Sequence, residues 1–231
     1  MSLICAEIGQ NFCGDMKLAK EMILDASLGG ADLVKFQLYD TDRIYAPQSK
    51  FRDRAKQAEL TFEQAFELYH YGRGAHIEVF FSVFDVERVA WCEKIGVKRY
   101  KIAYSKHADA DILKAVADTG KPVIISYSTL LPAGTLNGKR TPIYCVPEYP
   151  ATLDMLDFNN AFLSHISWAH GFSDHTIGID AAKVAMSLGI DYLEKHFCIA
   201  HDVGVDAPWS MDSAEVRELK RWNDIVNKLL P

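Results

Sequence analysis

Short apolar runs alternate with segments of helical periodicity along the whole chain, and this alternation restricts the fold more than any other feature. Such runs are typical of buried strands, and strands that alternate with helices favour a parallel sheet built of βα units. We expect eight strands, over residues Leu3–Gly9, Asp32–Leu38, Ile77–Phe84, Arg99–Tyr104, Pro122–Tyr127, Pro142–Val146, Ile166–Phe172 and Tyr192–Phe197. The sequence therefore predicts an α/β fold, a (β/α)₈ TIM barrel.

Helices are expected after most of these strands, over Met16–Leu28, Phe62–Gly72, Val86–Ile95, Asp111–Thr119, Ile179–Leu188 and Ser213–Leu230. Capping residues precede several of them, as at Asp15, Thr61 and Asp85. The connection between the fifth and sixth strands is short and rich in Gly and Pro, so we expect the fifth helix to be missing or reduced to a turn. The polar stretch after Leu38 is expected to form a long βα loop on the catalytic face.

Length and composition bound the possible functions. A chain of 231 residues, 49% of them hydrophobic, can bury one barrel core, and we expect residues 1–231 to form a single domain. The net charge of −6 argues against nucleic-acid and anionic-membrane partners. No apolar run approaches the ~20 residues that span a bilayer, and we expect no secretory signal. The five scattered cysteines form no CxxC pair, which indicates a cytoplasmic protein without disulfides.

Polar side chains gather at the carboxyl ends of the predicted strands, where barrel enzymes hold their active sites. The inward-facing members are Glu7, Lys35, Gln37, Ser82, Lys101, Ser126, Ser173, His175, Glu194 and His196. His175 and His196 are separated by about one strand–helix repeat, so they meet at the mouth and offer half of a divalent metal site. The alternative is two unrelated histidines, one capping a helix and one packed beside Phe197.

Two lysines stand in otherwise apolar strands, and a buried ammonium group is costly without a counter-charge. Lys35 and Lys101 therefore indicate an anionic ligand, such as a phosphate or a carboxylate. The alternative is a pair of internal salt bridges, with Lys35 bound to Glu7 and Lys101 to another acid. The serines at the neighbouring strand ends favour a phosphate-binding mouth beside the metal.

Several motifs in order carry a resemblance to a known family. They are Ala6–Asn11 with Gly14–Asp15, Gly30–Gln37, Tyr100–Ala103, Thr119–Ser126, Glu148–Pro150, Phe172–Gly178 and Glu194–Phe197. Over nearly the whole chain this pattern resembles the sialic acid synthase (N-acetylneuraminate synthase) family. The resemblance implies a barrel that condenses phosphoenolpyruvate with the open-chain aldehyde of an N-acyl hexosamine, such as N-acetylmannosamine. The products are a nonulosonic acid and inorganic phosphate.

The resemblance also implies roles for individual residues. Mn²⁺ or Mg²⁺ would be bound by His175 and His196. Phosphoenolpyruvate would be bound by Lys35, Ser82, Lys101, Ser126 and Ser173. The acceptor sugar would be contacted by Gln37, Tyr149 and Asp206. Glu7 would orient water or move a proton, and it joins the two lysines and the two histidines as an expected catalytic residue.

Departures from the family pattern cluster on the side of the acceptor sugar. Phe12 replaces a histidine, Lys106 replaces a glutamate expected near the sugar, and Pro147 replaces Asn or Ser. A Pro-Gly-Pro-Asp loop is replaced by Val203–Asp206, and the usual C-terminal antifreeze-like domain is not part of this sequence. These departures predict a different or smaller aldehyde, or a closing domain supplied by another chain.

Three other functions remain open from the residues alone. The first is a related 3-deoxy-ulosonic acid synthase that uses a different aldose or an aldose phosphate, the phosphate meeting Lys106 and basic residues of the long loop. The second is a Schiff-base aldolase, which needs a desolvated lysine. The third is a non-catalytic barrel that needs a partner domain. We also expect a homo-oligomer, as a dimer, if the reduced fifth helix leaves apolar surface exposed.

Overall fold

Eight parallel strands close into a barrel in the order of the chain, with β1 paired to both β2 and β8. The computed structural model describes residues 1–129, 140–164 and 167–230. The strands are β1 (Leu3–Gly9), β2 (Leu33–Leu38), β3 (Glu78–Val83), β4 (Tyr100–Ile102), β5 (Val123–Tyr127), β6 (Arg140–Cys145), β7 (Gly171–Asp174) and β8 (Tyr192–His196). The predicted (β/α)₈ TIM barrel is confirmed.

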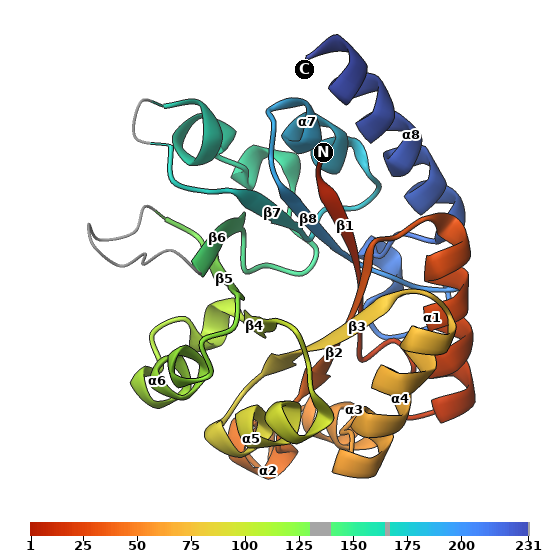
Figure 1. Ribbon diagram of the computed structural model, residues 1–231, viewed down its shortest axis with the longest axis vertical. Helices are drawn as coiled ribbons and strands as arrows, with labels where there is room; N and C mark the ends of the chain where they lie inside the picture. Colours follow the sequence, from red (N-terminus) through yellow and green to blue (C-terminus); the bar gives the residue numbers. More distant parts are fainter. Residues whose placement is uncertain (130–139, 165–166, 231) are drawn as a thin grey trace.

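Helices surround the strands, which gather in the middle of the molecule (Figure 1). They are α1 (Met16–Gly29), α2 (Thr41–Ile44), α3 (Arg52–Gln57), α4 (Phe62–Gly74), α5 (Val86–Ile95), α6 (Ala110–Asp118), α7 (Asp180–Ser187) and α8 (Ser213–Leu229). The described residues also contain the short helical segments η1 (Tyr104–Lys106), η2 (Leu153–Met155), η3 (Asn159–Leu163) and η4 (Ala207–Trp209). Among the helices of the described residues, none is long and apolar enough to cross a membrane.

The helix starts follow from local capping chemistry. The Asp15 carboxylate accepts from the backbone N–H groups of Lys17 and Leu18, which satisfies donors that the first turn of α1 cannot pair. Thr61 begins α4 with a reciprocal capping box, and Asp85 caps α5. The three caps predicted from the sequence are therefore confirmed.

Alternation along each strand creates two separate cores. Side chains of one parity, such as Ile4, Ala6 and Ile8 of β1, pack in the layer between the sheet and the helices. The other parity forms a plug inside the barrel from Cys5, Leu33, Phe80, Ile124, Ile143 and Tyr192. Two residues further along, five of these strands present Glu7, Lys35, Ser82, Ser126 and Glu194, all buried. A polar layer therefore lies directly on an apolar floor, at the carboxyl ends of the strands.

The structure differs from the sequence prediction in the bounds of β7 and in the segment after β2. β7 covers Gly171–Asp174 rather than residues 166–172, because the backbone N–H groups of Trp168 and Ala169 donate to the Ala161 carbonyl and close the loop after η3. The polar stretch after β2 is not an open loop, since it contains α2 and α3. The prediction of a reduced fifth helix falls on residues 130–139, outside the described residues.

Candidate active site

A small cavity of about 50 Å³ opens at the carboxyl end of the barrel. Its lining combines charged, hydroxyl and imidazole groups: Glu7, Lys35, Gln37, Ser82, Lys101, Ala103, Tyr104, Ser126, Cys145, Tyr149, Ser173, His175, Glu194 and His196. Every residue that the sequence assigned to the site is in this set except Asp206. Converging polar groups in a buried recess are the usual mark of a ligand site.

The two predicted anion-binding lysines are held by carboxylates and serines. Lys35 Nζ lies 2.6 Å from a Glu7 carboxylate oxygen and donates to Ser82 Oγ at 2.7 Å. Lys101 Nζ lies 3.2 Å from Glu194 and donates to Ser126 Oγ at 2.8 Å. The internal salt bridges considered as an alternative are therefore present, with Glu194 as the second acid. Each lysine nevertheless keeps a serine beside it at the cavity wall.

Glu194 lies at the centre of the charged layer, although the sequence only indicated that it faces inward. Its carboxylate accepts from Ser173 Oγ at 2.9 Å and from the Tyr192 hydroxyl at 3.0 Å. Burial by itself raises the pKa of this carboxyl, but Lys101 and Lys35 override burial and hold the pKa below its ordinary value. The alternation of Tyr192, Glu194 and His196 along β8 was the signal that could have found its role.

Carboxylates in turn stabilise the charged form of Lys35. Burial alone lowers the pKa of Lys35, but Glu194 and Glu7 outweigh it and raise that pKa above its ordinary value. Lys35 is therefore charged at neutral pH. A Schiff-base mechanism needs an unprotonated amine, so the structure disfavours Lys35 as a nucleophile.

His175 and His196 face one another with their ring centroids 5.9 Å apart. His175 Nδ1 lies 2.7 Å from the Val146 carbonyl, which can only accept, so Nδ1 carries the proton. Burial, with the neighbouring His196 acting in the same direction, lowers the pKa of His175 to about 3. His175 is neutral at pH 7 and presents Nε2 as a lone pair.

His196 is held by Asp206, whose Oδ2 atom lies 3.2 Å from His196 Nδ1. Burial opposes the charged imidazole, but Asp206 overrides it and raises the pKa of His196, while His196 in turn lowers that of Asp206 against burial. Both imidazoles thus have Nδ1 beside an oxygen acceptor. His175 Nε2 also lies 3.3 Å from Ser173 Oγ, but that hydroxyl donates its proton to Glu194 at 2.9 Å, so the Nε2 lone pair can still serve a cation. Histidine ligands of metals are oriented in this way, so the donor set fits a divalent cation.

Two predicted sugar-contacting residues line the cavity, and the third reaches it through a histidine. Gln37 Nε2 donates to Glu7 at 2.8 Å. The Tyr149 ring lies 4.1 Å from the His175 ring, between centroids, and is half exposed. Asp206 contacts His196 and is absent from the lining residues.

Two of the residues that depart from the family pattern, Lys106 and Phe12, lie away from the cavity. Lys106 pairs with Asp109 at 3.6 Å and does not line the cavity, so it does not introduce a cation there. Phe12 is buried in the outer core, edge-on to Phe36 at 5.7 Å between centroids. These two departures from the family pattern therefore alter residues around the cavity and not the residues that line it.

Outside the mouth, one group of three potential metal ligands occurs within the described part of the chain. It consists of His201, Asp212 and Glu215, with the ligating atoms within 4.8 Å of one another. Asp212 and Glu215 form the capping box of α8, and His201 Nε2 lies 3.3 Å from Glu215. Helix capping accounts for both carboxylates, so this group needs no metal to explain it.

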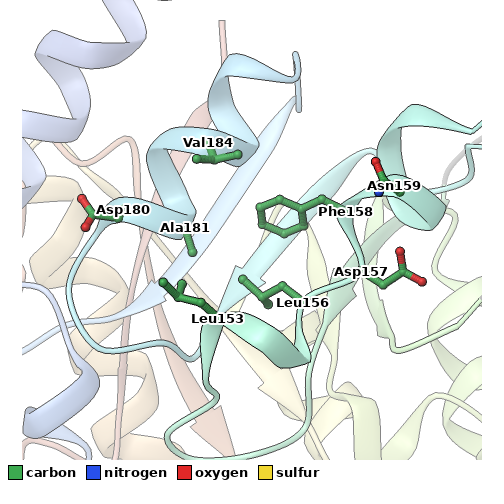
Figure 2. A pocket seen from close by; sticks show the side chains of 8 residues that line it. All are labelled: Leu153, Leu156, Asp157, Phe158, Asn159, Asp180, Ala181 and Val184. Carbon is green, nitrogen blue, oxygen red and sulfur yellow. The ribbon is translucent and has the colours of Figure 1, made fainter.

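A larger cavity of about 300 Å³ lies between η2, η3 and α7 (Figure 2). Its middle is apolar, with Leu156, Phe158 and Ala181 facing it, and Asp157 and Asp180 lie at opposite ends. It shares no lining residue with the mouth cavity. Its two carboxylates do not converge, so the mouth remains the candidate active site.

Comparison with known proteins supports this assignment. The model of the NeuB family matches residues 22–230. The chain belongs to the NeuB family. This confirms the family predicted from the sequence motifs, and with it a carbon–carbon bond-forming transferase of the sialic acid synthase type.

The relatives of this NeuB-family chain match over almost its full length. An uncharacterized protein of Methanocaldococcus jannaschii is 32% identical, with 99% of this chain and 72% of that protein covered. N,N'-diacetyllegionaminic acid synthase of Campylobacter jejuni is 29% identical, with 95% and 73% covered. The crystal structure of N-acetylneuraminic acid (sialic acid) synthetase from Leptospira borgpetersenii, in complex with citrate, matches with a TM-score of 0.92 and 27% identity. That match covers 99% of this chain and 85% of the other.

Proposed function

We propose that residues 1–231 form one synthase domain that condenses phosphoenolpyruvate with the open-chain aldehyde of an N-acyl hexosamine or a related aldose. The products are a nonulosonic acid and inorganic phosphate. One observation carries the proposal: two serine-paired lysines and two oriented histidines share a single buried cavity. Membership of the NeuB family supports the same reaction class.

Charge balance supports a divalent cation at His175 and His196. In the cavity two ammonium groups, Lys35 and Lys101, face two carboxylates, Glu7 and Glu194. These four charges cancel, whereas phosphoenolpyruvate brings a phosphate and a carboxylate. A bound Mn²⁺ or Mg²⁺ would supply the missing positive charge and polarise the sugar aldehyde as a Lewis acid.

The side chains divide the remaining work. Lys35 with Ser82, and Lys101 with Ser126, would hold the phosphate and carboxylate of phosphoenolpyruvate through charge-assisted hydrogen bonds. Carbon 3 of the enol forms a bond to the aldehyde carbon, and the aldehyde oxygen takes up a proton. Water adds at carbon 2, and the tetrahedral intermediate breaks its bond to the phosphate oxygen, which leaves a ketone. Glu7, placed by Gln37, is the proposed acceptor of the proton from water.

The acceptor class is tested by measuring phosphate release from phosphoenolpyruvate with Mn²⁺ and a panel of aldehydes. The panel holds N-acyl hexosamines, pentoses and aldose phosphates. We expect release that depends on an N-acyl hexosamine. Release only with an aldose phosphate would establish the related ulosonic acid synthase instead, and no release with any acceptor would contradict the proposal for this chain by itself.

The predicted homodimer and cytoplasmic location stay predictions.

The binding role of Lys101 gives a second expected result. Lys101→Met should weaken binding of phosphoenolpyruvate at least about tenfold, because one charge-assisted hydrogen bond contributes roughly 1.5–3 kcal/mol and Glu194 loses the nearer of its two counter-charges. Isothermal titration calorimetry in the presence of Mn²⁺ measures this. Lys106→Met is the matched control, since Lys106 lies outside the cavity lining. This variant should bind phosphoenolpyruvate as tightly as the unaltered protein does. Equal affinities in the two variants would remove Lys101 from the binding site.

A further inference from the structure

The loop between β8 and α8 folds back over the end of β8 and carries Asp206. Its two ends are joined, because the Met211 N–H donates to the His196 carbonyl at 2.7 Å and the Cys198 N–H donates to the Met211 carbonyl at 3.0 Å. Asp206 lies between these ends and reaches His196 Nδ1. Two short hydrogen bonds therefore anchor the loop, but they leave the position of Asp206 within it undetermined.

A side chain from the opposite end of the sequence settles that position. Asn11 follows β1 and is fully buried. Its Nδ2 donates to the Phe197 carbonyl at 2.8 Å and to Ser210 Oγ at 3.0 Å, and its Oδ1 accepts from the Asp206 N–H at 2.7 Å. The orientation of the amide follows from these partners, because a backbone N–H can only donate and a carbonyl can only accept.

The loop is shaped to receive this amide. Gly204 has a φ of 111°, and a Cβ there would lie 2.5 Å from Asn11 Oδ1. Ser210 Oγ, which accepts from Asn11, donates to the Asp206 carbonyl at 2.7 Å. Both backbone polar groups of Asp206 are thus held by the Asn11 and Ser210 side chains, at the position from which its carboxylate meets His196.

We propose that Asn11 is a positioning residue, which sets the His196 imidazole by holding Asp206 in place. This inference rests on the proposed function, because it concerns the affinity of the histidine pair for a divalent cation. Removing a side chain that orients a histidine ligand typically lowers metal affinity or activity by about 10- to 100-fold. Asn11 acts one step further from the cation, through Asp206.

The chain offers a matched control at the other end of the barrel. Asn223 on α8 is also buried and also binds backbone: it accepts from the Ser2 N–H at 3.3 Å and donates to the Ser2 carbonyl at 2.8 Å. Asn223→Ala therefore removes a comparable buried amide without touching the mouth. A purely structural role for Asn11 predicts the same behaviour in both alanine variants.

The test measures Mn²⁺ affinity by calorimetry, with no substrate, together with the urea midpoint. We expect Asn11→Ala to weaken Mn²⁺ binding about tenfold, and Asn223→Ala to leave it unchanged although its urea midpoint also falls. Asp206→Ala should weaken binding as well, and adding Asn11→Ala to it should cause little further loss, because both changes act through one contact. Should Asn11→Ala fail to fold, Gly204→Ala displaces the same amide from the loop side and should weaken Mn²⁺ binding likewise.

The outcomes separate this inference from the proposed function. Unaltered Mn²⁺ affinity in Asn11→Ala, or independent losses in the double variant, would overturn the positioning role alone and leave the synthase proposal standing. An unaltered protein that binds no Mn²⁺ would overturn the proposed histidine site, and the positioning role with it.

Discussion

Replacing His175 and His196 together with alanine is expected to reduce Mn²⁺-dependent phosphate release by at least about 10³-fold. A bound metal contributes several kcal/mol to stabilising charge in the transition state, and each 1.4 kcal/mol corresponds to about tenfold in rate. In this structure the two ring centroids are 5.9 Å apart, His175 Nδ1 lies 2.7 Å from the Val146 carbonyl, and His196 Nδ1 lies 3.2 Å from the Asp206 carboxylate. Steady-state kinetics with phosphoenolpyruvate and the preferred acceptor measure the loss.

The control is His170→Ala. His170 is a largely exposed histidine that pairs with Asp191 at 3.6 Å and lies outside the cavity lining, so its removal should leave the rate near that of the unaltered protein. The double variant should also lose Mn²⁺ binding in calorimetry. Phosphate release that survives in the double variant at a tenth or more of the normal rate would exclude this histidine pair as the metal site.

Removal of a buried ion pair on the outer side of the barrel is expected to have the largest effect on stability. Lys195 and Asp174 are fully buried, with Lys195 Nζ 2.9 Å from the carboxylate. Asp174→Ala leaves the Lys195 charge unpaired and also removes the acceptor for the Thr176 N–H. Breaking one partner of such a pair costs roughly 3–5 kcal/mol, so the free energy of unfolding should fall by about that amount. Urea denaturation followed by circular dichroism measures it.

Two further variants make this result specific. Lys114→Met breaks the exposed pair between Lys114 and Asp118 on α6, and should cost about 0.5 kcal/mol or less. Asp174→Leu combined with Lys195→Met replaces both charges by apolar groups and should recover much of the loss, because no buried charge is left unpaired. Equal losses in Asp174→Ala and Lys114→Met would show that the buried pair does not govern stability.

The sequence predicted which side chains face the mouth where the information is local. Alternation along a strand determines which side chains face inward, so Lys35 and Gln37 on β2, and Glu194 and His196 on β8, were placed at the mouth from their spacing alone. The structure lines the cavity with all four. The boundaries of β7 were missed, since hydrogen bonds to Ala161 exclude Trp168 from the strand, and no local pattern encodes them.

Contacts across the barrel were beyond the reach of the sequence pattern. Lys101 on β4 meets Glu194 on β8, two strands that are not neighbours in the sheet. Asp206 lies behind His196 rather than in the cavity lining, and Asn11 holds its backbone from the other end of the chain. By itself the sequence determined the eight-stranded barrel and the residues that face its mouth, because the direction of a side chain follows from the backbone repeat. Only the tertiary structure decided which charges pair and what orients each histidine, because closure of the barrel and the fold-back of its last loop bring distant residues together.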